Sequence, residues 1–492
     1  MFYFKTIISR IMGIDEVQRQ SIVSLIWQIV NTAIGFIGTM YFAHAVGASV
    51  LGAYFLFVTY LGIFAMLSDG GLGGAAIKRI SEGEEQDAYF SAFFSLRFLL
   101  IIAVVCGLLV FRRYFVDLDN AGLFIWIILA LLVSQFSGAV STGIAGCGKM
   151  GIHSTGTFIY RLLRTLVQIV AIFLGFGAAG LAGGYVFPMI VVAVFELRFF
   201  NLRFVRFTWE HIKSLGTFSF WLFLTSTGAL LYSSSDTVMI GYYMDNADVG
   251  VYRVVILFTS IAAFTTVALQ QTLWPKVSRW SKTSEYGLIE EALSRAFSYS
   301  LILAVPVFAG GVLLGDRLLY FFYGAKFASG YLPLVILLTV QIVNVFQFLF
   351  TTYLSALDRQ KDAFKVTAVA ASANVVINLL LIPVMGITGA AIATLVTMML
   401  NAILARHILS KLITIRMDHN SLLNILKASA VMSLFVGLYR MMVPLSSVWV
   451  TLVPVIVGGI MYSVLILKFD WKMCNELKGI VTKVGIPWPE WL

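Results

Sequence analysis

Basic side chains interrupt the long apolar stretches in the first part of the chain at Arg97, Arg161 and Arg164. Arg161, Arg164 and Gln168 recur at i, i+3 and i+7, which places them on one face of a helix. A charge inside a hydrocarbon layer is costly, so it usually faces a cavity or a partner. Because guanidinium groups present planar forks of donors to phosphate oxygens, these residues predict a site for a diphosphate.

Two amides on an earlier apolar run, Gln28 and Asn31, share a helical face. We expect them to lie at a depth in the membrane similar to that of the three arginines and to contribute to the same binding site. We expect no acidic residue to neutralise the arginines, because Asp69 and Glu196 fall near the ends of apolar runs. The alternative is that the arginines reach the lipid headgroups through their long side chains, which would leave no binding site.

A second polar group lies further along the chain. Asp236 precedes the end of one apolar run and Arg253 follows the start of the next, so an antiparallel hairpin predicts a buried ion pair between them. The alternative role for Asp236 is binding of a coupling proton or cation. Asn374 and Asn378 share another helical face, where amides typically form interhelical hydrogen bonds.

The sequence has no signature of catalysis or of cofactor binding. Its three cysteines are scattered without a metal-ligand spacing, and neither a phosphate-binding loop nor paired catalytic carboxylates in an exposed loop occur. We therefore expect a protein that is not an enzyme and that holds no metal and no cofactor.

Composition places these residues in a membrane. Hydrophobic residues make up 60% of the chain and charged residues 12%, about half the charged fraction of ordinary globular proteins. A spanning helix needs roughly 20 mainly apolar residues, which predicts an all-α polytopic membrane protein with about fourteen spans. The expected spans are 21–43, 50–69, 90–111, 122–145, 155–177, 179–200, 216–241, 249–272, 294–314, 331–353, 364–384, 388–409, 423–442 and 446–468.

Lysine and arginine gather in alternate loops between these spans, which by the positive-inside rule predicts cytoplasmic N- and C-termini in the cell membrane. This topology accounts for the net charge of +10 without nucleic acid as a partner. Residues 1–20 are expected to lie at the cytoplasmic interface, and residues 471–492 to form a cytoplasmic tail.

The chain also repeats itself. Thr39–Tyr54 aligns without gaps on Thr237–Tyr252 and matches Gly52 with Gly250, and further matches pair Lys149 with Arg359 and Gly177–Ala182 with Gly386–Ala391. We expect two homologous lobes, residues 21–213 and 214–410, followed by two helices in 411–470 that have no counterpart in the repeat. Two facing lobes of membrane helices are typical of alternating-access transporters.

Several segments resemble the multidrug/oligosaccharidyl-lipid/polysaccharide flippase superfamily. They are the Asp-Thr-x-x-Ile-Gly pattern within Phe218–Phe258, the proline of Leu273–Ser278, and the Asn- and Gly-rich Asn374–Thr394. The resemblance is strongest to the polysaccharide transporter branch. It implies a flippase for lipid-linked oligosaccharides, with membrane lipids and polysaccharide assembly enzymes as partners. The alternatives are a cation-coupled multidrug antiporter of the same superfamily and a membrane glycosyltransferase or polymerase.

Overall fold

The computed structural model describes residues 16–475 and residue 478. Its regular elements are all helical, and no strand occurs in this described part of the chain. Most of the N-terminal segment 1–20 and of the tail 471–492 lies outside the described residues. The helices are α2 (Glu16–Asp69), α3 (Leu72–Ser81), α4 (Gln86–Val110), α5 (Val116–Asn120), α6 (Phe124–Gly146), α7 (Met150–Phe173), α8 (Gly177–Leu197), α9 (Trp209–Tyr243), α10 (Asn246–Thr259), α11 (Phe264–Lys282), α12 (Tyr286–Tyr323), α13 (Tyr331–Ala356), α14 (Gln360–Leu409), α15 (His419–Met442) and α16 (Val448–Phe469), with 3-10 turns η1 (Arg112–Tyr114), η2 (Ser260–Ala263) and η3 (Ala325–Gly330).

Within the described residues, 11 helices are long and apolar enough to cross a membrane, or 12 when the bent helix α9 counts as a span. Large apolar side chains on their outer faces are exposed, among them Val110, Phe173 and Trp449. Helices satisfy their own backbone hydrogen bonds, so such apolar surfaces can face lipid. The expectation of an all-α, multi-pass membrane protein is confirmed.

Two of the spanning elements are pairs of helices joined at a glycine. The backbone leaves the helical region at Gly47 in α2 (φ 76°) and at Gly386 in α14 (φ 59°). Positive φ is accessible to glycine at little cost, because it has no Cβ. At 1.5 Å per residue, the 50 residues of α14 would extend about 75 Å, more than twice the hydrocarbon thickness. Counting each pair as two spans, together with α9, gives fourteen within the described residues, the number expected.

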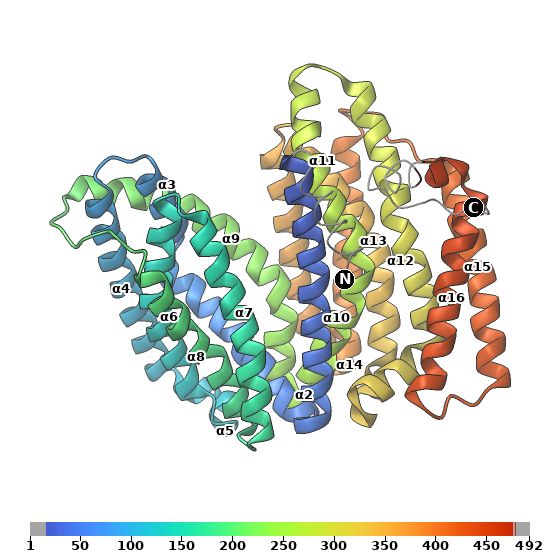
Figure 1. The fold of residues 1–492 in the computed structure, drawn as a ribbon, viewed down its shortest axis with the longest axis horizontal. Helices are drawn as coiled ribbons and strands as arrows, with labels where there is room; N and C mark the ends of the chain where they lie inside the picture. Colours follow the sequence, from blue (N-terminus) through green and yellow to red (C-terminus); the bar gives the residue numbers. More distant parts are fainter. Residues whose placement is uncertain (1–15, 476–477, 479–492) are drawn as a thin grey trace, which may run out of the picture. The chain divides into compact units, whose positions relative to one another are not determined.

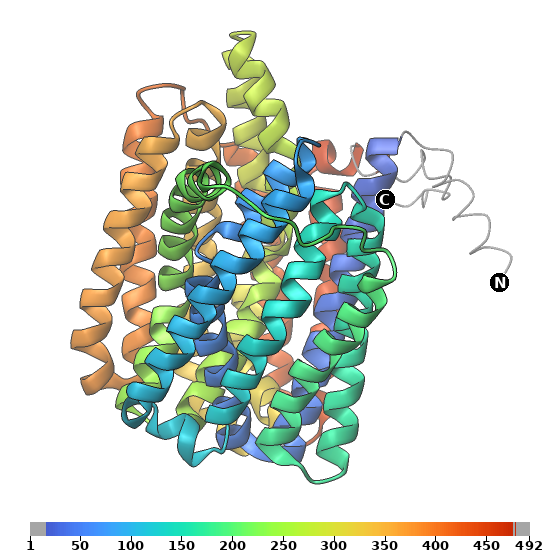
Figure 2. The ribbon, with the colours of Figure 1, turned by 90° about the vertical axis from the view of Figure 1, so that its left-hand side faces the viewer.

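The chain forms two compact units, which we describe separately. One consists of Tyr41–Arg253 and Asn374–Ala390. In it α8 packs along α6 and α7, while α3 packs against α4, α6 and α9. The helices α4, α6, α7 and α8 run side by side in Figure 1 and again in Figure 2. Apart from Gln28 and Asn31, the candidate residues discussed in the next subsection belong to this unit.

The other unit consists of the residues up to Met40, Val254–Ala373 and the residues from Ala391 on. Its central helix is α12, which contacts α11, α13, α15 and α16 (Figure 1). An ion pair between Arg440 of α15 and Asp316 of α12, with 2.9 Å between nitrogen and oxygen, reinforces this packing. The boundaries of the two units differ from those of the sequence repeat, so the lobes at 21–213 and 214–410 stay a prediction.

Candidate functional site

The hydroxyl oxygen of Tyr54 on α2 accepts hydrogen bonds from Arg164 and Gln168, two residues of the helical face that the sequence predicted to bind a diphosphate. Nη2 of Arg164 donates a hydrogen bond of 2.6 Å to this oxygen, and Nε2 of Gln168 donates one of 2.8 Å. Both donors lie on α7, one turn apart, so they reach the same acceptor. Gln168 is buried and also bonds the carbonyl oxygen of Leu181 on α8 at 2.8 Å. The three helices α2, α7 and α8 are thereby joined at Gln168.

Arg164 also contacts the aromatic ring of Tyr185. Its guanidinium carbon lies 4.7 Å from the centroid of the Tyr185 ring, a distance suited to a cation–π interaction. Tyr160 packs edge-on against Tyr185, with 6.0 Å between centroids. Because Tyr54 accepts a single N–H of the guanidinium, other N–H groups are left to donate to the oxygens of an anionic ligand.

The remaining residues predicted for this site are not gathered around Tyr54. Arg161 is exposed on α7, where either a ligand or a lipid headgroup can meet it, and its role stays a prediction. Gln28 and Asn31 belong to α2, but their side chains lie outside the described residues. Tyr54 and Tyr185 were not among the predicted residues. The sequence signal that points to Tyr54 is its match with Tyr252 in the repeat.

One expectation about Arg97 is wrong. Its Nε lies 3.6 Å from Oδ1 of Asp69, so an acidic partner is present. Asp69 is the last residue of α2, and the long side chain of Arg97 on α4 extends to it. Residue spacing along a single helix does not reveal such a contact between two helices. Arg97 is only 8% exposed, and Gly138 of α6 gives its guanidinium room, since a Cβ there would lie 2.8 Å from Nη2.

A second buried polar cluster surrounds Asp236 of α9. Its Oδ2 accepts a hydrogen bond of 2.8 Å from the Tyr252 hydroxyl, and its Oδ1 accepts one of 2.6 Å from Nδ2 of Asn378. Ser235 and Asn378 both donate to Oδ1 of Asn374 at 2.9 Å. A buried set of carboxylate and amide oxygens has the chemistry to hold a proton or a hard cation, and this role stays a prediction.

The predicted ion pair between Asp236 and Arg253 is not formed in the described part of the chain. The guanidinium carbon of Arg253 lies instead 5.8 Å from the centroid of Phe55. Successive helical residues point about 100° apart at 3.6 residues per turn, so Tyr252 and Arg253 do not face the same partner. Tyr252 takes the position beside Asp236.

The two clusters occupy equivalent positions of the internal repeat. In each cluster, the hydroxyl of a tyrosine from the repeat forms a hydrogen bond with a charged side chain. Tyr54 accepts a hydrogen bond from Arg164, and Tyr252 donates one to Asp236. At the offset that aligns Lys149 with Arg359, the side chains of α7 align with those of α14. The aligned pairs are Tyr54 with Tyr252, Arg164 with Asn374, and Gln168 with Asn378.

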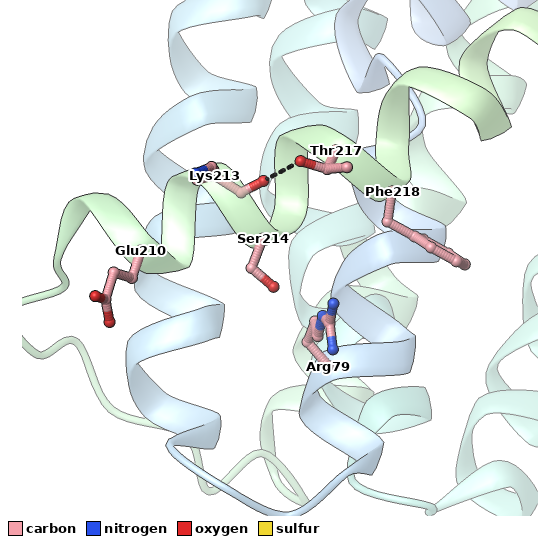
Figure 3. A pocket seen from close by; sticks show the side chains of 6 residues that line it. All are labelled: Arg79, Glu210, Lys213, Ser214, Thr217 and Phe218. Carbon is pink, nitrogen blue, oxygen red and sulfur yellow. Dashed lines mark hydrogen bonds between the residues drawn. The ribbon is translucent and has the colours of Figure 1, made fainter.

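Figure 3 shows a separate pocket of about 510 Å³ between α3 and α9. Arg79 enters it from α3, and the other lining residues come from α9. Arg79 already pairs with Glu82 at 3.0 Å. Because Glu210 adds a negative charge beside Lys213, the pocket has no strong preference for an anion. Its lining residues are Arg79, Glu210, Lys213, Ser214, Thr217 and Phe218.

Comparison with known proteins decides the family. The model of the family described as "Polysaccharide biosynthesis protein" matches residues 17–281, more than half of the chain. The chain belongs to this polysaccharide biosynthesis protein family. Two curated relatives come from Haloferax volcanii. The "Probable low-salt glycan biosynthesis flippase Agl15" is 26% identical over 471 residues, covering 96% of this chain and 100% of the relative. The "Probable flippase AglR" is 28% identical over 392 residues, covering 78% and 81%.

Solved structures show the fold of this family member. The lipid II flippase MurJ in an inward closed conformation matches with a TM-score of 0.77 and 16% identity, covering 92% of this chain and 100% of that one. An inward-facing multidrug resistance MATE family transporter of the MOP superfamily matches with a TM-score of 0.61 and 16% identity, covering 77% and 95%. These structures show that the chain shares the fold of both transporters. The family match bears out the expected resemblance to polysaccharide transporters.

Proposed function

We propose that this protein is a flippase that moves a lipid-linked oligosaccharide, carried on a polyprenyl diphosphate, from the inner to the outer leaflet of the cell membrane. Membership of a polysaccharide biosynthesis family supports this function. So does the similarity over nearly the whole chain to a relative named as a flippase. The protein acts as a transporter rather than as an enzyme. The lipid-linked oligosaccharide that it moves to the outer leaflet is the substrate of the enzymes that assemble a surface polysaccharide or glycan.

The observation that carries the proposal is the position of Arg164. Its guanidinium contacts the Tyr54 hydroxyl and the Tyr185 ring, and N–H donors of the guanidinium remain for a ligand. A diphosphate offers several oxygens to a planar fork of donors, and such charge-assisted hydrogen bonds are about twice as strong as neutral ones. Arg164 is the binding residue in this proposal, Gln168 and Tyr54 position it, and Arg161 attracts the substrate from its exposed place on α7.

Alternating access is the mechanism that fits two homologous lobes. In this scheme the lobes 21–213 and 214–410 rock about a site that contains the diphosphate, while the lipid tail stays in the bilayer. Glycines with positive φ, such as Gly47 and Gly386, provide the bends between consecutive spans. The distribution of lysine and arginine supports cytoplasmic N- and C-termini, so the substrate enters from the cytoplasmic leaflet.

Cation-coupled multidrug export is the second candidate function. The likeness of the fold to a MATE family transporter, at a TM-score of 0.61, and the buried carboxylate of Asp236 favour it. A site for a cationic drug calls for carboxylates that face the ligand, whereas the first cluster presents the arginine Arg164. The flippase is therefore the better supported function.

A leaflet assay separates the two functions. The full-length protein is reconstituted in liposomes with a fluorescent polyprenyl diphosphate oligosaccharide, and a membrane-impermeant quencher reports how much label has changed leaflets. The flippase reading predicts exchange well above that of protein-free liposomes, together with no uptake of cationic dyes such as ethidium. Dye transport without exchange of the lipid-linked sugar would replace the flippase by the drug antiporter.

A further inference from the structure

A band of uncharged polar side chains runs along α13, in the unit whose central helix is α12. Its members follow one another every three or four residues and so lie on one side of the helix: Gln341, Asn344, Gln347 and Thr351. The band covers 10 positions, about 15 Å at the helical rise, and Thr351 still lies five residues before the end of α13. The segment Ala325–Ala356 is long and apolar enough to span a membrane, so the band lies at the depth of the hydrocarbon.

The amides of the band are half-buried, and their hydrogen bonds run mainly along their own helix. Nδ2 of Asn344 donates to Oε1 of Gln341 at 3.2 Å. Nε2 of Gln347 donates at 3.4 Å to Oγ1 of Thr351, and at 3.4 Å to Oδ1 of Asn401 on α14. Within the described part of the chain, Oδ1 of Asn344 and Oε1 of Gln347 accept no hydrogen bond. These two oxygens therefore stay open to a polar ligand.

Amide side chains in membrane helices usually form hydrogen bonds that join one helix to another. Among the described residues, the amides of the band make one such bond, the long contact between Gln347 and Asn401. A polar group that faces lipid without a partner is costly. Half-buried amides in the middle of a span therefore indicate a face that meets water or a polar ligand rather than lipid.

The internal repeat indicates that helix packing does not require amides at these positions. At the offset that aligns α7 with α14, Asn344 and Gln347 of α13 align with Ser134 and Ser137 of α6. The hydroxyl groups of these serines donate to carbonyl oxygens of their own helix, at 2.8 and 3.0 Å. A serine bonded in this way needs no partner outside its helix. The longer amides of α13 extend beyond their own backbone and can contact a ligand.

Asn401 orients the amide of Gln347. It is only 1% exposed, its Oδ1 accepts the hydrogen bond from Gln347, and its Nδ2 has no hydrogen-bond partner in the described residues. A buried donor that is left unpaired costs stability, so packing alone does not favour an asparagine here. The oxygen and the nitrogen of an amide diverge from one carbon, so Oε1 of Gln347 points away from Asn401. Asn401 is therefore a positioning residue for the acceptor of Gln347.

We propose that Asn344 and Gln347 bind the sugar part of the lipid-linked oligosaccharide, an inference that rests on the proposed flippase function. A sugar hydroxyl both donates and accepts hydrogen bonds, and an amide side chain offers both kinds of partner. Helix α13 contains no charged residue, which suits a neutral sugar rather than a diphosphate or a cationic drug. Recognition of the sugar is thereby separate from recognition of the diphosphate, which the proposed function assigns to Arg164.

Two soluble ligands separate the contribution of the sugar from that of the diphosphate. They are inorganic pyrophosphate and maltotriose that carries a diphosphate at its reducing end. Isothermal titration calorimetry on the full-length protein in detergent measures Kd for both. The wild type should bind the trisaccharide diphosphate at least about tenfold more tightly than pyrophosphate, the effect of one or two added hydrogen bonds.

The band variant replaces both amides by apolar side chains of similar size, Asn344→Leu together with Gln347→Met. It should bind pyrophosphate as the wild type does and should lose the preference for the trisaccharide diphosphate. The matched control, Asn420→Leu together with Gln360→Met, makes the same exchanges at exposed positions and should keep the preference. Each single substitution in the band should remove part of the preference, which keeps the test available if the double variant does not fold.

The outcomes distinguish ligand binding from a structural role of the amides. An equal loss of affinity for both ligands in the band variant would overturn the proposal, as would a variant that keeps the preference or a wild type that has none. The leaflet assay tests the flippase independently. Leaflet exchange by a protein whose sugar preference does not depend on the band would sustain the flippase and overturn the sugar site. A preference that depends on the band, in a protein that moves no lipid-linked sugar, would sustain the sugar site and refute the flippase.

Discussion

Gly52 and Gly250, which occupy equivalent positions of the internal repeat, lie directly against each other. A Cβ on Gly52 would be 2.7 Å from the backbone nitrogen of Gly250, and a Cβ on Gly250 would be 3.1 Å from that of Gly52. The carbonyl oxygens of Asn246 and Ala48 are closer still to these positions. Small residues let membrane helices approach to backbone contact. The two copies of the repeated segment, Thr39–Tyr54 and Thr237–Tyr252, are therefore in contact through these glycines, where α2 packs against α10.

Gly52→Ala should destabilise the protein because the new methyl group collides with the carbonyl oxygen of Asn246. Overpacking of this kind costs about 1–3 kcal/mol. The matched control is Gly62→Ala on the same helix, where a Cβ meets nothing within 4 Å. Thermal unfolding in detergent should show a lower Tm for Gly52→Ala alone. Equal Tm values for the two variants would contradict the close approach.

Tyr252→Phe should lower stability because it removes the hydroxyl that donates to Oδ2 of Asp236 at 2.8 Å. A hydrogen bond to a charged group contributes about 1.5–3 kcal/mol. Tyr353→Phe is the control, since the Tyr353 hydroxyl is buried without a hydrogen-bond partner, and its removal should leave stability unchanged or raised. Denaturant titration of both variants measures the difference. A larger loss in Tyr353→Phe would overturn the assignment of the polar cluster.

An ion pair outside the membrane gives a prediction about pH. Asp418 caps α15, and Nζ of Lys472 lies 3.0 Å from its Oδ2. The hydrogen bond from Lys472, assisted by those from the backbone of Ser421 and Asn420, lowers the pKa of Asp418 against the opposing effect of burial. A lowered pKa in the folded state means that the pair stabilises the protein above the ordinary pKa of about 3.9.

This stabilisation is lost as the pH falls through the lowered pKa of Asp418. Lys472→Met should therefore reduce Tm by a constant amount near neutral pH, and the difference from the wild type should vanish in acid. Melting curves over a pH series test this. A difference that grows as the pH falls would show that the pair does not act through the charge of Asp418.

The elements were largely predictable because each spanning helix needs a long apolar run, which is visible in composition alone. The helix breaks at Gly47 and Gly386 fall between consecutive spans expected from the sequence. The compact units follow a different division from the sequence repeat, because contacts between helices depend on side chains that meet in space.

The site was less predictable. Helical spacing brought Arg164 and Gln168 together, and the structure joins both to Tyr54. Spacing along one helix gave no information on partners from other helices, so Asp69 beside Arg97 was missed. The same limit explains why Tyr252, and not Arg253, bonds Asp236.

The central claim is that Arg164 binds the diphosphate of a lipid-linked oligosaccharide. The direct measurement is the flipping rate of the reconstituted Arg164→Gln variant, compared with the wild type and with Arg113→Gln, whose arginine is exposed in the 3-10 turn η1. Loss of charge-assisted hydrogen bonds worth about 1.5–3 kcal/mol predicts a rate at least about tenfold lower for Arg164→Gln. The rate is normalised to the amount of folded protein, because the variant also loses the hydrogen bond to Tyr54. Arg113→Gln should keep the wild-type rate. A folded Arg164→Gln variant that flips the substrate at the wild-type rate would contradict the claim.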